Sequence, residues 1–155
     1  MIDHGCRARL TAPVAGYSGT PLAKKLGIKA GARVALVRAP AGFEVALEPL
    51  PDGVRMRTQT RSAQDVVLFF ATRRAELERR FDGFARSIAP NGGLWVAWPK
   101  RTACVATDLR ENVVREVGLA HGLIDNKVCA VDEVWSGLRF VYRLEDRPAA
   151  NGRVR

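Results

Sequence analysis

Basic and hydroxyl side chains follow three predicted strands at the points where those strands end. The strands are expected at 33–37, 65–70 and 94–98, and parallel strands bring their carboxyl ends to one edge of a sheet. Cations gathered there suit a phosphate or carboxylate, and the helix after the second strand adds its positive end. The sequence therefore predicts an anion-binding rim, unless the hydroxyl merely caps a helix and the cations are solvated. The candidates are Arg38, Thr72, Arg73, Lys100 and Arg101.

A second group of candidates lies further along the chain. Asp108 and Asn112 belong to the start of a predicted helix, and Glu133 and Trp135 belong to a tight connection between two predicted strands. These four residues could line a pocket or an interface. The alternative is structural, because Asp108 with Glu111 has the spacing of a capping box and Trp135 could pack into the core.

The sequence predicts neither a catalytic nucleophile nor a metal centre. His4 and His121 have no visible Cys or Asp partner for a triad. The three cysteines are odd in number and lack the close pairing of zinc or redox motifs, which favours reduced, structural thiols. We therefore assign no catalytic residue and no metal ligand.

Residues 65–100 predict the unit around which the fold is built. Residues 65–70 form an apolar run, Leu77, Phe81 and Phe84 recur at helical spacing, and 94–98 form a second apolar run. Pro, Asn and two Gly at 90–93 predict a turn before the last strand. A strand, a covering helix and a parallel strand make a right-handed crossover, with both faces of the sheet covered by helices.

The flanking segments extend this sheet. A short helix is expected from Pro21 to Gly27, with the Thr20 hydroxyl as its cap, and a brief edge strand at 54–58. A helix ending at Gly122 precedes a hairpin over 127–143, which adds an antiparallel strand. The predicted fold class is α/β, a Rossmann-like three-layer sandwich with a mostly parallel sheet. One domain is expected at 17–144, between a flexible arm at 1–16 and a flexible tail at 145–155.

The loop after the first strand bears on cofactor binding. Nucleotide-binding sheets place a glycine-rich turn there, but residues 38–43 contain one glycine, and Pro40 removes an amide donor. The strand expected at 54–58 also ends without an acid for a ribose diol. The motif therefore does not support S-adenosylmethionine, and the cofactor is unknown.

The order of elements over residues 28–143 resembles that of class I methyltransferases, which bind S-adenosylmethionine. The resemblance rests on the Gly31 lead into the first strand, the Ala-Pro-Asn-Gly-Gly run at 89–93 and the closing hairpin. Segments at 15–27, 94–100, 107–116 and 125–140 are also similar to a bacterial family of domains of unknown function, number 3052. That family implies a small single-domain cytoplasmic protein and assigns no catalytic residue.

Composition limits the functions that remain. The chain of 155 residues has a net charge of +9, and residues 1–60 carry nine Lys or Arg against four Asp or Glu. No apolar run is long enough to span a bilayer, so we expect a cytoplasmic protein with no membrane partner. The main prediction is a non-catalytic or regulatory protein that binds a phosphate-bearing ligand or a protein partner. One alternative is a methyltransferase-like enzyme with an atypical S-adenosylmethionine site, and another is a basic nucleic-acid-binding accessory protein.

Overall fold

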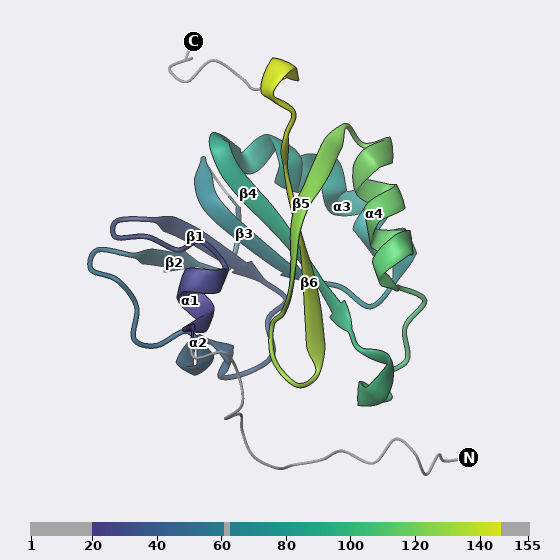
Figure 1. Cartoon of the computed structure of the whole chain (residues 1–155), viewed down its shortest axis with the longest axis horizontal. Coiled ribbons are helices and arrows are strands. Elements are labelled where there is room, and N and C mark those ends of the chain that lie inside the picture. The colour runs from purple at the N-terminus through teal and green to yellow at the C-terminus, as the bar shows by residue number, and fades with distance from the viewer. Residues whose placement is uncertain (1–19, 61–62, 147–155) are drawn as a thin grey trace.

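The computed structural model describes residues 20–60 and 63–146, which form a mixed α/β structure around a six-stranded sheet (Figure 1). The order of strands is β2-β1-β3-β4-β6-β5. β1 to β4 pair in parallel, and β6 pairs antiparallel with both β4 and β5. This arrangement confirms the predicted Rossmann-like class with its closing hairpin. The strands are β1 Arg33–Val37, β2 Arg55–Arg57, β3 Gln64–Phe70, β4 Ile88–Pro99, β5 Leu123–Ala130 and β6 Trp135–Tyr142.

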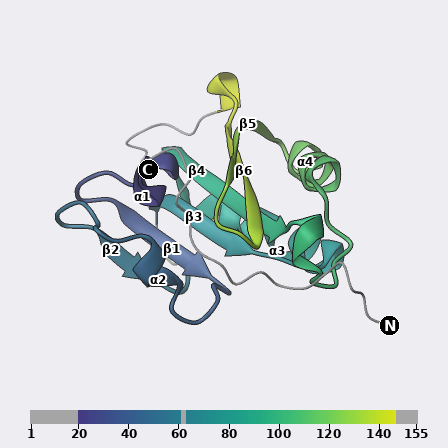
Figure 2. The ribbon, with the colours of Figure 1, turned by 60° about the horizontal axis from the view of Figure 1, so that its bottom comes forward.

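Helices cover both faces of the sheet. In Figures 1 and 2, α1 and α2 lie together on one side of the molecule, and α3 and α4 lie on the other. The helices are α1 Leu22–Lys25, α2 Phe43–Ala46, α3 Arg74–Ser87 and α4 Glu111–Ala120, with short 3₁₀ turns η2 Arg101–Ala103 and η3 Leu144–Asp146. The pattern of apolar residues explains the layers, because the central strands are buried on both faces.

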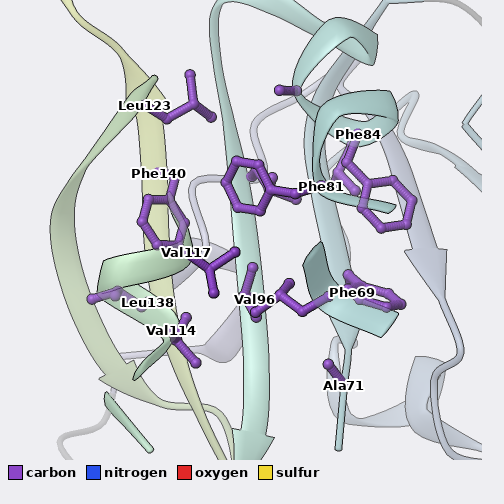
Figure 3. Close-up of a cluster of buried hydrophobic side chains, with 14 of the residues drawn as sticks. Phe69, Ala71, Phe81, Phe84, Val96, Val114, Val117, Leu123, Leu138 and Phe140 are labelled. Atoms are coloured by element: carbon purple, nitrogen blue, oxygen red, sulfur yellow. The ribbon is translucent and has the colours of Figure 1, made fainter. Parts of the chain in front are cut away.

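The larger core cluster fills the space between the sheet and the helices α3 and α4. Phe81 points from α3 toward Phe140 of β6, and the two rings meet edge to face with centroids 5.4 Å apart (Figure 3). Val114 and Val117 enter the same cluster from α4. These side chains are fully buried, so burial of apolar surface fixes both helices on this face.

The second core cluster lies beneath α1 and α2. Trp95 of β4 is fully buried there, and its Nε1 donates a hydrogen bond of 3.0 Å to the carbonyl of Leu26. The Lys127 ammonium donates to the carbonyl of Lys25 at 3.1 Å. Side chains from β4 and β5 therefore satisfy carbonyls at the end of a helix only four residues long.

The structure corrects two local predictions. Residues 90–93 are not a turn but part of β4, where the register shifts between Gln64 and Val66 of the partner strand. The strand begins early because Ile88 already pairs with Gln64, and β4 then has three more residues than β3 before Gly93 pairs with Val66. In α1, Pro21 rather than Thr20 occupies the N-cap position. Gly27 ends that helix as predicted, in the left-handed conformation with φ of 84°.

Other predictions concern the ends of the chain, the cysteines and the membrane. The predicted arm at 1–16 lies outside the described residues, and the first two residues of the predicted tail belong to η3. Cys104 is disulfide-bonded, so the expectation of reduced thiols is wrong for this residue, whereas Cys129 is free. Among the described helices, none has the length and apolar character that a bilayer span requires.

Candidate site at the carboxyl edge of the sheet

The five predicted rim residues all lie at the carboxyl edge of the parallel strands. Arg38 follows β1, Thr72 and Arg73 follow β3, and Lys100 and Arg101 follow β4. The structure places three of them in two separate hollows, and Thr72 and Arg73 line neither hollow. Lys100 and Arg101 line the first hollow, and Arg38 lines the second.

The first hollow, here called the β4–α4 hollow, has a volume of about 460 Å³. Trp98 and Leu109 give it an apolar wall, and Asn112 and Ser136 add polar side chains. Its basic lining consists of Lys100, Arg101, Arg110 and Arg115.

Arg115 is the most constrained of these cations. It donates hydrogen bonds to Glu111 at 2.8 Å and to Asp125 at 2.9 Å, and these bonds raise its pKa. Its charge is therefore already balanced by two carboxylates, and Lys100, Arg101 and Arg110 are the cations that remain for an anion.

The second hollow, here called the β1–β2 hollow, has a volume of about 310 Å³ at the carboxyl ends of β1 and β2. Leu36 and Met56 supply apolar surface, Arg57 a guanidinium and Glu44 a carboxylate. Its floor is the loop predicted to lack a glycine-rich motif, and Gly42 in this loop has a φ of 79°.

Arg38 stands between the β1–β2 hollow and α3. Its φ is 63°, a left-handed conformation that few residues other than glycine adopt, and its Nη1 lies 3.5 Å from the Glu76 carboxylate. Arg80 contacts the same carboxylate at 3.5 Å. Glu76 therefore holds Arg38 toward α3, and Arg57 is the less constrained cation of this hollow.

Thr72 and Arg73 lie between the two hollows, because β3 is between β1 and β4 in the sheet. Thr72 is not the cap of α3, since Arg73 occupies that position. The Thr72 carbonyl instead accepts a hydrogen bond from the Thr107 hydroxyl at 2.7 Å. The role of these two residues in anion binding stays a prediction.

The predicted capping box of Asp108 and Glu111 is wrong. α4 begins at Glu111 with Arg110 in the N-cap position, and Glu111 pairs with Arg115. The Asp108 carboxylate accepts a hydrogen bond of 2.7 Å from the amide of Arg74, the first residue of α3. Sequence spacing cannot reveal this partner, because α3 and β4 separate Arg74 from Asp108 along the chain.

The connection between β5 and β6 has a structural explanation. Asp132 accepts hydrogen bonds from the amides of Val134 and Trp135, both at 2.8 Å. Trp135 meets the Phe70 ring edge to face at 5.0 Å and is partly buried, as its core-packing alternative predicted. Glu133 is exposed beside this turn, while Asn112 lines the β4–α4 hollow.

Sequence reasoning missed several residues of the two hollows. Arg57 and Glu44 in one, and Arg110 and Arg115 in the other, were not candidates. Arg57 carried a usable signal, because it lies next to the carboxyl end of the strand predicted at 54–58, at the same edge as Arg38. For a metal, the described residues hold no group of three or more His, Cys, Asp or Glu suited to bind one.

The fold resembles those of several solved proteins, two of which are named as methyltransferases. A SAM-dependent methyltransferase from Aquifex aeolicus matches with a TM-score of 0.56 and 15% identity over 77% of this chain and 86% of its own. The fibrillarin pre-rRNA processing protein of Methanococcus jannaschii matches with a TM-score of 0.52 and 10% identity over 82% and 70%. Magnesium protoporphyrin IX methyltransferase from Synechocystis PCC 6803 matches with a TM-score of 0.52 and 9% identity over 79% and 74%.

Sequence comparison adds no assignment beyond this likeness. No family model matches the chain, and no curated protein matches it significantly. The resemblance to family 3052 and the bacterial origin therefore stay predictions. At these identities the structural likeness establishes the fold, and function must be argued from the site.

Proposed function

We propose that this protein binds S-adenosylmethionine in the β1–β2 hollow and methylates an anionic acceptor bound in the β4–α4 hollow. The observation that carries the proposal is the position of both hollows at the carboxyl ends of parallel strands, in a sheet similar to those of methyltransferases. Ligands of open α/β sheets bind at this edge.

The residues of the β1–β2 hollow suit the chemical groups of this cofactor. The Arg57 guanidinium can bind the carboxylate of the methionine part, and Glu44 can accept hydrogen bonds from the ammonium group or the ribose hydroxyls. Leu36 and Met56 offer apolar surface for the adenine ring. When bound, the cofactor supplies a methyl group on a sulfonium sulfur, which leaves as a neutral thioether as the acceptor atom forms the new bond.

The β4–α4 hollow suits an acceptor that carries negative charge. Lys100, Arg101 and Arg110 surround an apolar wall formed in part by Trp98. Cations over an apolar surface orient a ligand that has both a phosphate or carboxylate and a planar or aliphatic part. In the proposal these residues position the acceptor, and no side chain is assigned the role of a base.

A second candidate function is binding of an anionic ligand without chemistry. This candidate is favoured because the two hollows adjoin core clusters on opposite faces of the sheet. Leu36 and Met56 belong to the cluster under α1 and α2, whereas Trp98 and Leu109 belong to the cluster under α3 and α4. An acceptor must therefore reach the methyl group across the end of β3, beside Thr72, a constraint that simple binding does not face.

A thermal-shift titration separates the two candidates. Binding at ~100 times the dissociation constant adds roughly 2.7 kcal/mol to the free energy of unfolding, which raises the melting temperature by several degrees. A shift with S-adenosylmethionine and S-adenosylhomocysteine supports the methyltransferase proposal. A shift with phosphate-bearing ligands alone supports the second candidate and rejects the first.

A further inference from the structure

A third hollow lies at the opposite, amino-terminal edge of the sheet, where neither candidate function places a ligand. It has a volume of about 320 Å³ and is bordered by Ala32 before β1, by Asp65 of β3 and by Asn91 of β4. Lys29 and Arg139 complete its polar lining. We call it the amino-end hollow.

Arg139 supplies the partly buried cation of this hollow. It sits on β6 opposite Trp95 and is partly buried, and this burial lowers its pKa. Its guanidinium lies over Gly93 so closely that a Cβ at that position would overlap it. The glycine and the arginine thus fit each other, and the guanidinium is held at the wall of the hollow.

The described residues compensate the charge of Arg139 poorly. Among the described residues, its guanidinium makes one long hydrogen bond of 3.4 Å, from Nη1 to the side-chain oxygen of Asn126. Within residues 20–60 and 63–146, no carboxylate lies within 4.0 Å of its guanidinium. A partly buried cation without a direct ion pair costs stability, and an anion bound beside it lowers that cost.

The other polar groups of the hollow suit a hydrogen-bond donor. Asp65 Oδ2 accepts a hydrogen bond from the Arg33 amide at 2.9 Å and contacts Arg33 Nε at 3.5 Å. These contacts leave Oδ1 of Asp65 for a ligand. Lys29 is exposed at the mouth and adds positive charge.

We propose that the amino-end hollow binds a small ligand with an anionic group for Arg139 and a hydrogen-bond donor for Asp65. The anionic group is a phosphate or a carboxylate, since both accept paired hydrogen bonds from a guanidinium. The site is independent of the carboxyl edge, so it does not rest on the proposed methyltransferase function.

The test is a titration of the ¹⁵N-labelled full chain followed by amide chemical shifts. The probes are inorganic phosphate, phosphoethanolamine and β-alanine, of which the last two carry an ammonium donor beside a phosphate or a carboxylate. We expect saturable shifts at the amides of Gly31 and Asn91. Phosphoethanolamine and β-alanine together decide which anionic group the site prefers.

Three variants test whether the probes bind in the amino-end hollow. Arg139→Gln should weaken binding by at least about tenfold, because it removes charge-assisted hydrogen bonds. Arg79→Gln, on the exposed face of α3, is the matched control and should bind as the wild type does. Asn91→Asp adds a second carboxylate to the hollow beside Asp65, so it should also weaken anion binding. This variant keeps the test decisive if the Arg139 variant fails to fold.

The proposal is overturned if none of the three probes causes saturable shifts at these amides. It is also overturned if either Arg139→Gln, once folded, or Asn91→Asp binds a probe as tightly as the wild type.

Discussion

The carboxylate of Asp108 accepts a hydrogen bond of 2.7 Å from the backbone amide of Arg74, 34 residues earlier in the chain. The Thr107 hydroxyl donates to the Thr72 carbonyl at 2.7 Å beside it. The loop that leads into α4 is thereby fastened to the loop that leads into α3. The loop that leads into α4 also lines the β4–α4 hollow through Arg101 and Arg110, so this connection fixes the shape of the carboxyl edge there.

Asp108→Ala should lower the free energy of unfolding by about 1 kcal/mol, as the loss of a helix cap does. The Asn variant keeps an acceptor for the Arg74 amide and should lose a smaller amount. Urea denaturation measures both. Glu111→Ala serves as the comparison, because its exposed pair with Arg115 should contribute less than about 1 kcal/mol. A larger loss for Glu111→Ala than for Asp108→Ala would contradict the assignment.

The helical glycines Gly118 and Gly83 should respond oppositely to alanine. A Cβ at Gly118 of α4 would overlap the buried Phe140 ring, so Gly118→Ala should destabilise the protein by about 1–3 kcal/mol. A Cβ at Gly83 of α3 meets nothing within 4 Å, so Gly83→Ala should stabilise it by up to about 1 kcal/mol. Thermal and urea unfolding test the pair. Equal effects at both sites would refute the packing of α4 against β6.

Because of Tyr142, the free energy of unfolding should depend on pH in the alkaline range. Burial raises the pKa of this phenol, although the charge of Arg86 acts in the opposite direction, and its hydroxyl donates to the Ala85 carbonyl at 2.6 Å. The unfolded chain therefore ionises first, and the free energy of unfolding falls as the pH rises above the ordinary tyrosine value of about 10. Below that pH the contribution is fully present.

Tyr142→Phe should cost about 1 kcal/mol at neutral pH through the lost hydrogen bond. Its free energy of unfolding should then fall less steeply than that of the wild type above a pH of about 10. Urea denaturation at several pH values compares the two proteins. Parallel curves across the alkaline range would show that the buried phenol does not contribute.

Lys100 and Arg101 should matter for ligands and little for stability. The double variant Lys100→Ala/Arg101→Ala should weaken an anionic ligand of the β4–α4 hollow by about tenfold or more, and change the free energy of unfolding by less than about 1 kcal/mol. A phosphate-bearing ligand found in a binding screen supplies the readout. A large loss of stability would mean that these side chains are structural.

Much of the fold follows from the sequence because it depends on apolar periodicity. β1 has the predicted bounds, and the closing hairpin and the helix with Phe81 and Phe84 are present. The run at 90–93 misled the prediction, because an irregular pairing with β3 uses the same glycine and proline residues as a turn. The role of Asp108 at the start of α3 was also missed, because its partner, the Arg74 amide, is distant in the sequence.

The site was less predictable than the fold, for a physical reason. Parallel strands place Arg38, Thr72 and Lys100 at one edge, and this much follows from topology. Which side chains share a hollow depends on how α2 and α4 pack, and a single sequence does not reveal this. Arg57 and Arg139 could not be distinguished from solvated cations until their surroundings were known.

The most direct test of the central claim is a calorimetric titration of S-adenosylhomocysteine into the wild type, Arg57→Gln and Arg55→Gln. Arg57 lines the β1–β2 hollow, whereas Arg55 lies two residues earlier on the same exposed edge strand and does not. We predict saturable binding by the wild type and Arg55→Gln, and a loss of about tenfold or more in Arg57→Gln. No binding to the wild type, or equal binding to all three proteins, would contradict the account.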